Sequence, residues 1–130
     1  MLSGRCLCGA VRYETSDAPE YVFNCYCATC RRETGAGHAT VVAVSDRGLK
    51  ISGETKVVAP PRENGAPPIP RFFCPECGTT LFARPPGLPN VVTLRAGTLD
   101  GRFDLRIQES AFAAQAQPWD RPPAEIPMKD

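Results

Sequence analysis

The segment CPECG, residues 74–78, places Cys74 and Cys77 on either side of a short turn and follows them with Gly78. In a turn of this kind both thiolates face one metal ion, and backbone N–H groups can bond to the sulfurs. Glycine after the second cysteine allows the left-handed backbone that the turn needs. A site built from protein takes four ligands, so this pair predicts half of a zinc site.

The chain contains seven cysteines, and they form three groups: Cys6 with Cys8, Cys25 with Cys27 and Cys30, and Cys74 with Cys77. Two partnerships would complete the zinc site at the turn from Cys74 to Cys77, which we call the knuckle. In the first, the N-terminal pair joins Cys74 and Cys77, and the middle group holds a second metal with three thiolates. In the second, thiols of the middle group join the knuckle, and the N-terminal pair stays free.

We favour the first partnership, a division of four and three cysteines. Cys6 and Cys8 stand at the start of a predicted strand, where alternate residues face one side. This division also uses every cysteine. A four-thiolate zinc is closed and structural, whereas a three-ligand zinc keeps an open position, as catalytic zinc does. A water or thiol at that position loses its proton near neutral pH.

Two readings without a metal compete with this one. A C-x-x-C pair can be a redox motif, but that motif expects a strand–helix–strand context, which the chain does not suggest. Cysteines can also be buried apolar residues. Three cysteines in the six residues from Cys25 to Cys30 argue against that reading.

Bulk composition narrows the function classes. The chain has 130 residues, which suits one domain, and 15 basic against 14 acidic side chains give a net charge of +1. The chain contains no block of like charges, so we expect no nucleic-acid partner. No stretch approaches the roughly 18 apolar residues of a membrane span, and the first residues lack an apolar secretory signal. We therefore expect a cytoplasmic protein with reduced thiols and no membrane partner. The sequence contains no signal for the oligomeric state.

Fourteen prolines and eleven glycines divide the chain into short segments. Alternating or β-branched runs predict strands at 10–14, 38–44, 69–73, 79–84 and 90–96. The segment Ala28–Thr34 predicts a short helix that ends at Gly35. Residues 59–70, with five prolines, predict an irregular exposed loop. We expect one mainly β zinc-binding domain with short helical turns over 1–117, followed by a Pro-rich tail over 118–130 that wraps the surface or frays.

Four segments together resemble the glutathione-dependent formaldehyde-activating enzyme family, which also includes the domain of a vertebrate centromere protein. They are GRCLCGAVRYE (4–14), NCYCATCRRETG (24–35), FFCPECGTTLFAR (72–84) and AGTLDG (96–101), and the resemblance covers residues 3–101. It implies an Mss4-like, β-tent fold and a carbon–sulfur lyase or synthase that joins formaldehyde to glutathione, giving S-(hydroxymethyl)glutathione. It also implies a structural zinc at Cys6, Cys8, Cys74 and Cys77, and a second, catalytic-type zinc at Cys25, Cys27 and Cys30.

The chain departs from the family at two places. Tyr26 stands between the first two cysteines of the middle group, where the family usually has histidine. The segment DLRIQES (104–110) replaces a His-Ile-Trp-like stretch, so substrate contacts from that region do not carry over.

Other residues are weaker candidates. Arg31 and Arg32 follow the middle cysteines and could bind a glutathione carboxylate, or form a solvated helix face. His38, the single histidine, could be a ligand or base, or open a strand. Tyr26 could bond to substrate or pack beside the cysteines. We expect Asp100 to cap a turn. The core is expected to contain Phe72, Phe73 and Phe82.

The sequence thus favours a zinc enzyme that acts on a thiol–aldehyde adduct. The alternative is a non-catalytic, zinc-stabilised binding module whose second metal site is vestigial. A nucleic-acid-associated zinc ribbon, the third class, conflicts with the near-neutral charge.

Overall fold

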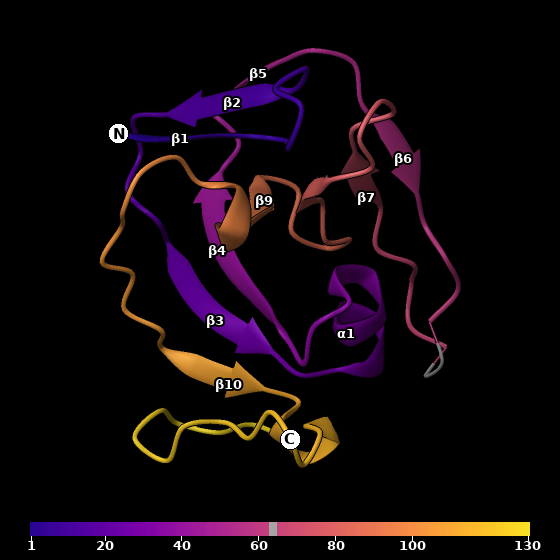
Figure 1. The fold of residues 1–130 in the computed structure, drawn as a ribbon, viewed down its shortest axis with the longest axis vertical. Helices are drawn as coiled ribbons and strands as arrows, with labels where there is room; N and C mark the ends of the chain where they lie inside the picture. Colours follow the sequence, from indigo (N-terminus) through magenta and orange to yellow (C-terminus); the bar gives the residue numbers. More distant parts are fainter. Residues whose placement is uncertain (63–64) are drawn as a thin grey trace.

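A computed structural model describes residues 1–62 and 65–130. Its described part contains a small and a large β-sheet (Figure 1). The small sheet has the order β1-β2-β5, with β1 (Leu2–Arg5), β2 (Arg12–Thr15) and β5 (Lys50–Ser52). The mainly β class expected from the sequence is confirmed.

The large sheet has seven strands among the described residues, in the order β10-β3-β4-β9-β8-β7-β6. All of its neighbours are antiparallel except β10 and β3, which run parallel. The strands are β3 (Tyr21–Cys25), β4 (Ala39–Ser45), β6 (Lys56–Val58), β7 (Arg71–Phe73), β8 (Thr80–Ala83), β9 (Val91–Arg95) and β10 (Glu109–Ala111).

One face of the central strands β4 and β9 lies in the main core. Val42, Val44, Val92 and Leu94 are shielded from solvent, as β-branched and aliphatic residues in the middle of a sheet should be. Phe82 belongs to the same core and stacks on the partly buried Phe72, with 4.8 Å between ring centroids. Phe73 is half-buried.

Helix α1 (Ala28–Thr34) occupies the predicted residues and ends, as predicted, at Gly35. The sulfur of Cys27 accepts the N–H of Cys30 at 3.3 Å and so caps the first turn. Gly35 has φ of 70°, the left-handed conformation that ends a helix at little cost for glycine. Two short 3₁₀ turns, η1 (Ala96–Thr98) and η2 (Ala113–Gln115), complete the helical elements of the described residues.

Each of the five predicted strands overlaps an observed strand, β2, β4, β7, β8 or β9, whose ends differ from the prediction by no more than two residues. One expectation is wrong: Cys6 and Cys8 do not begin a strand. They follow β1 and lie in the turn to β2, where Val11 donates its N–H to the Cys6 sulfur at 3.3 Å. The turn, and not strand alternation, directs both thiols to one side.

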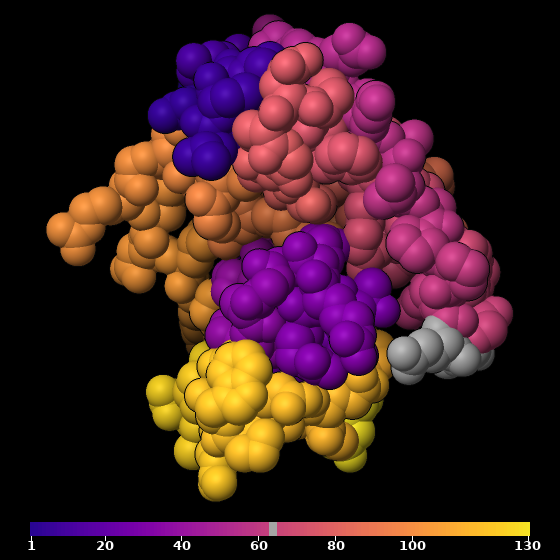
Figure 2. Space-filling model, turned by 45° about the vertical axis from the view of Figure 1, so that its right-hand side comes forward, coloured from indigo at the N-terminus to yellow at the C-terminus, as the bar shows by residue number. Residues whose placement is uncertain are grey.

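The C-terminal segment packs back on the domain, next to the helix-containing segment (Figure 2). Ser110 donates its N–H to Pro127 O at 2.8 Å, and Lys129 donates to Ser110 O at 2.9 Å. Asp120 pairs with His38. The division into 1–117 and 118–130 stays a prediction, and Glu63 and Asn64 of the predicted 59–70 loop lie outside the described residues. No helix in the described parts has the length and apolar character to span a bilayer.

Gly4 in β1 is predicted to be intolerant of a side chain. A Cβ at this position would overlap the Tyr13 ring and lie 2.5 Å from Thr98 O. Gly4→Ala should lower the free energy of unfolding by about 1–3 kcal/mol, the usual cost of overpacking. Gly97→Ala is the control because nothing lies within 4 Å of its Cβ. Urea denaturation measures both, and equal midpoints for the two variants would contradict the prediction.

Candidate metal centres

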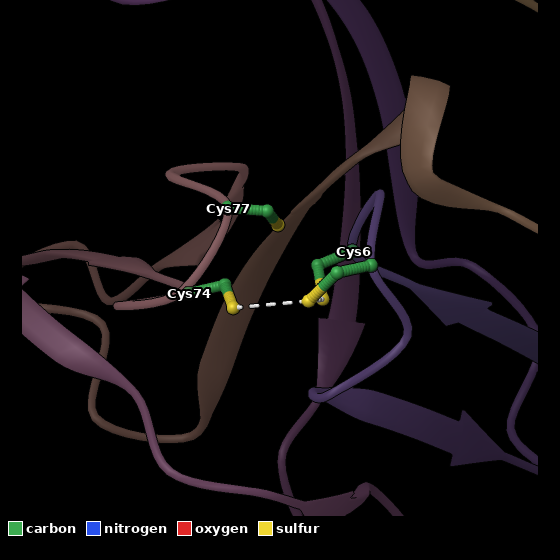
Figure 3. Close-up of side chains that lie close together, drawn as sticks. Cys6, Cys74 and Cys77 are labelled. Atoms are coloured by element: carbon green, nitrogen blue, oxygen red, sulfur yellow. Dashed lines mark hydrogen bonds between the residues drawn. The ribbon is translucent and has the colours of Figure 1, made fainter.

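Four cysteines meet where the two sheets approach each other. Cys6 and Cys8 come from the β1–β2 turn, and Cys74 and Cys77 come from the β7–β8 turn. Their sulfurs all lie within 4.8 Å of one another. Figure 3 shows Cys6, Cys74 and Cys77 pointing toward a common centre. The structure therefore brings together the four residues of the favoured partnership.

The spacing of these sulfurs suits a tetrahedral ion. Zinc–sulfur bonds of about 2.3 Å place the sulfurs of a tetrahedral site about 3.8 Å apart. The Cys6 and Cys8 sulfurs are 3.7 Å apart, and those of Cys8 and Cys74 are 3.8 Å apart. Both separations are far longer than the roughly 2.05 Å of a disulfide, and all seven cysteines are free thiols.

The β7–β8 turn has the conformation that its sequence predicted. Gly78 has φ of 79° and donates its N–H to Cys74 O at 2.8 Å. The Thr79 hydroxyl lies 3.2 Å from the Cys77 sulfur. This hydrogen bond, with backbone N–H groups, lowers the pKa of Cys77 to about 5. The turn therefore favours thiolate, the form in which sulfur binds metal.

The second cluster contains Cys25, at the end of β3, with Cys27 and Cys30 at the first turn of α1. These three sulfurs also lie within 4.8 Å of one another. The Cys25 and Cys27 sulfurs are 3.4 Å apart. Hydrogen bonds from Cys25 and Cys30 lower the pKa of Cys27, whereas hydrogen bonds with Cys25 and Cys27 raise the pKa of Cys30. One sulfur of the three is thus favoured as thiolate before any metal binds.

A cavity of about 610 Å³ opens beside the second cluster, and all three of its cysteines line the wall. This volume is within the range of small-molecule sites. Much of the remaining wall is apolar, formed by residues that include Phe23, Val41, Ile69, Ala83, Leu88 and Phe112. Arg62, Arg71 and Arg95 also line it, with Glu20 as the acidic residue of the wall, so basic side chains outnumber acidic ones there.

Two arginines singled out in the sequence lie outside this cavity wall. Arg32 is exposed, and the partly buried Arg31 has an Nε atom with no hydrogen-bond partner among the described residues. Sequence reasoning missed Arg71 and Arg95, which line the cavity instead. The local sequence contained no signal for these two arginines, because both are at least 41 residues away from the three-cysteine cluster in the chain.

Tyr26 and His38 form a separate group. Tyr26 is 1% exposed, and its ring packs against that of His38 in a tilted arrangement with 4.7 Å between centroids. His38 Nδ1 lies 2.5 Å from the Asp120 carboxylate. Burial, followed by the negative charge of Asp120, raises the pKa of Tyr26. Neither ring lines the cavity beside the cysteines, so the packing role weighed for Tyr26 fits this arrangement.

Asp100 lies beside β1 of the small sheet. Its carboxylate accepts the Ser3 hydroxyl at 3.2 Å, and its N–H donates to Ser3 O at 2.8 Å. These bonds attach the turn after η1 to β1, which agrees with the expected structural role.

Taken together, the fold and its sites define a class: a small β protein with one four-cysteine and one three-cysteine cluster, each with the donor set of a metal centre, the second open to a cavity. The chain belongs to the glutathione-dependent formaldehyde-activating enzyme family, whose model matches residues 1–119. The resemblance found in the four sequence segments is confirmed.

Two known proteins extend this comparison. A protein of Halomonas elongata named "Putative glutathione-dependent formaldehyde-activating enzyme" is 32% identical over 104 residues, which are 77% of this chain and 66% of that protein. A crystal structure of a Rhodobacter sphaeroides protein matches with a TM-score of 0.59 and 20% identity, over 78% of this chain and 91% of the other. This structural likeness supports the Mss4-like fold expected from the resemblance.

Substitutions in the two clusters should separate stability from metal binding. Cys77→Ser should remove about one metal equivalent and destabilise the chain by several kcal/mol, because binding free energy in such sites contributes to folding. Cys27→Ser should also remove metal, but its cluster joins residues only a few positions apart, whereas the other cluster joins turns 66 residues apart. Serine is also a good N-cap, so the loss of stability should be clearly smaller than for Cys77→Ser. Elemental analysis and urea denaturation measure both effects. Equal destabilisation by the two variants would contradict this difference in role.

Proposed function

We propose that the protein joins a thiol to an aldehyde. Membership of the family suggests that the thiol is glutathione and the aldehyde formaldehyde, which would give S-(hydroxymethyl)glutathione. The protein would be a carbon–sulfur lyase or synthase. The observation that carries the proposal is the three-cysteine cluster on the wall of a cavity of about 610 Å³. An incomplete donor set that faces a space for a small molecule is typical of catalytic sites, and a complete set such as the four-cysteine cluster is typical of structural ones.

We infer that both clusters bind zinc. Cys6, Cys8, Cys74 and Cys77 would hold a closed, structural ion, and Cys25, Cys27 and Cys30 would hold an ion with an open position. When bound, the second ion would act as a Lewis acid and favour the thiolate form of a substrate thiol. Seven free thiols fit a reducing compartment, so we also propose a cytoplasmic location.

The reaction needs little besides a thiolate and correct orientation. The substrate sulfur forms a bond to the aldehyde carbon, the carbonyl π electrons move to oxygen, and oxygen takes a proton equivalent to the one that the thiol lost. The apolar wall formed by Phe23, Val41 and Phe112 would exclude water from the reacting atoms. Holding both reactants in one cavity would supply the rate gain, because orientation lowers the entropic cost of a bimolecular step.

A second candidate function is a zinc-stabilised binding module with a vestigial second site. Tyr26 favours it, because the residue that replaces the usual histidine is buried and packs on His38. That arrangement leaves the residue no evident part in proton transfer at the cavity. The four-cysteine cluster alone would be enough to stabilise such a module.

Metal content and turnover distinguish the two functions. We expect two zinc ions per chain and faster formation of the glutathione–formaldehyde adduct than without protein, followed by exchange NMR. Cys27→Ser should bring the rate to background while the chain stays folded. A panel of other thiols with formaldehyde identifies the substrate. Protein with both sites filled that gives no acceleration with any thiol would overturn the enzyme, and one zinc per chain in the native protein would favour the module.

A further inference from the structure

Glu33 joins two arginines on the wall of the cavity. It lies on α1, whereas Arg71 begins β7 and Arg95 ends β9. Its carboxylate pairs with Arg71 Nε and accepts Arg95 Nε at 2.6 Å and Arg95 Nη2 at 3.1 Å. The three side chains are 8–10% exposed, so solvent screens these contacts little. The carboxylate therefore fixes the orientation of both guanidinium groups.

The two guanidinium groups have more donors than the protein uses. Each has five N–H bonds. Besides the bonds to Glu33, Arg71 donates to Ile69 O at 3.3 Å and Arg95 donates to Thr93 O at 3.4 Å. No other acceptor is found for either side chain among the described residues, and neither contains a sealed, unpaired nitrogen. Arg71 Nη2 is the one nitrogen of the two side chains without an acceptor among the described residues, and since it is not sealed from solvent it is open to a ligand. The cavity is the space that both side chains line.

Charge in this cluster is also unbalanced. Two guanidinium cations face one carboxylate, which leaves one positive charge in a largely buried group. Burial opposes the charge of Arg95, but the hydrogen bonds and charge of Glu33 raise its pKa, with a smaller contribution from Cys30 and Cys25. Arg95 is thus within electrostatic range of the sulfurs. Arg71 keeps the larger share of unused donors, because Glu33 occupies only one of its nitrogens.

We propose that Arg71 and Arg95, held by Glu33, form a receptor for a carboxylate of the thiol substrate. This inference rests on the proposed function in one respect, that a thiol occupies the cavity. A guanidinium fork matches a carboxylate in shape and charge. The substrate class is then a thiol that carries a carboxylate at a distance spanned by the cavity, and neutral or cationic thiols bind poorly.

Binding is measured by calorimetry without aldehyde, on the 130-residue chain loaded with zinc. The probes are glutathione and its diethyl ester, which has the same thiol and no carboxylate, together with 3-mercaptopropionate and 2-mercaptoethanol as a shorter pair. Affinities are compared at equal thiolate concentration. Each pair is measured with the wild-type chain, with Arg71→Met, and with Arg84→Met. Arg84 is a matched control, because it directly follows β8 next to Arg71 but does not line the cavity.

For the wild-type chain and Arg84→Met, loss of the carboxylate should weaken binding at least about tenfold in one of the pairs, the usual effect of losing a charge-assisted hydrogen bond. For Arg71→Met the difference should shrink to about twofold. If Arg71→Met does not fold, Arg71→Lys replaces it, because lysine keeps the charge but loses the fork. For Arg71→Lys, the ratio of affinities for the carboxylate thiol and its neutral analogue should fall to half of the wild-type ratio or less.

Three results would overturn the receptor. The first is a wild-type chain that binds each carboxylate thiol no more tightly than its neutral analogue. The second is a folded Arg71 variant that keeps the full carboxylate preference. The third is an equal loss of affinity for charged and neutral thiols, which would mean that the arginines act on the sulfur. Turnover is absent from these measurements, so failure of the proposed reaction with formaldehyde is detected separately.

Discussion

Four thiols from two turns that are 66 residues apart converge on one point, and both sheets are attached there. The β1–β2 turn belongs to the small sheet and the β7–β8 turn to the large one. Cys6 and Cys74 are also members of the main hydrophobic core, so the cluster and the core constrain the same elements. A domain of this size has a modest core, and a metal ion bound at the junction of its sheets would compensate for that.

The two cysteine clusters use the same ligand atom in different surroundings. The four-cysteine cluster is held by turns that donate hydrogen bonds to sulfur, through Val11 N–H and the Thr79 hydroxyl. The three-cysteine cluster lies at a strand end and a helix start, where the Cys27 sulfur also caps α1. The three sulfur-bearing side chains of this cluster also line the cavity. The two clusters therefore differ in the number of thiols and in the opening beside them, and not in ligand type.

Sequence reasoning succeeded where the signal is local. The spacing of the cysteines and the helix from Ala28 to Gly35 depend on residues within one turn of each other. It failed where partners are distant: Glu33 meets Arg71 and Arg95 across 38 and 62 residues, and no local pattern marks them as a unit.

Strand β3 was missed because Asn24 interrupts its apolar alternation. Asn24 is nonetheless buried, and its side-chain oxygen accepts the Thr40 hydroxyl at 2.7 Å.

The order of the large sheet has a consequence for folding kinetics. Its neighbours β10 and β3 are separated by more than 80 residues of chain, and the paired residues of β4 and β9 are 46 to 54 positions apart. Chains dominated by such distant pairings fold slowly, because loop closure has to precede the contacts that reward it. Metal capture by the β7–β8 turn, whose two thiols are already neighbours, would shorten that search by giving the N-terminal turn a fixed target. The rate of refolding should then depend on metal supply as well as on temperature.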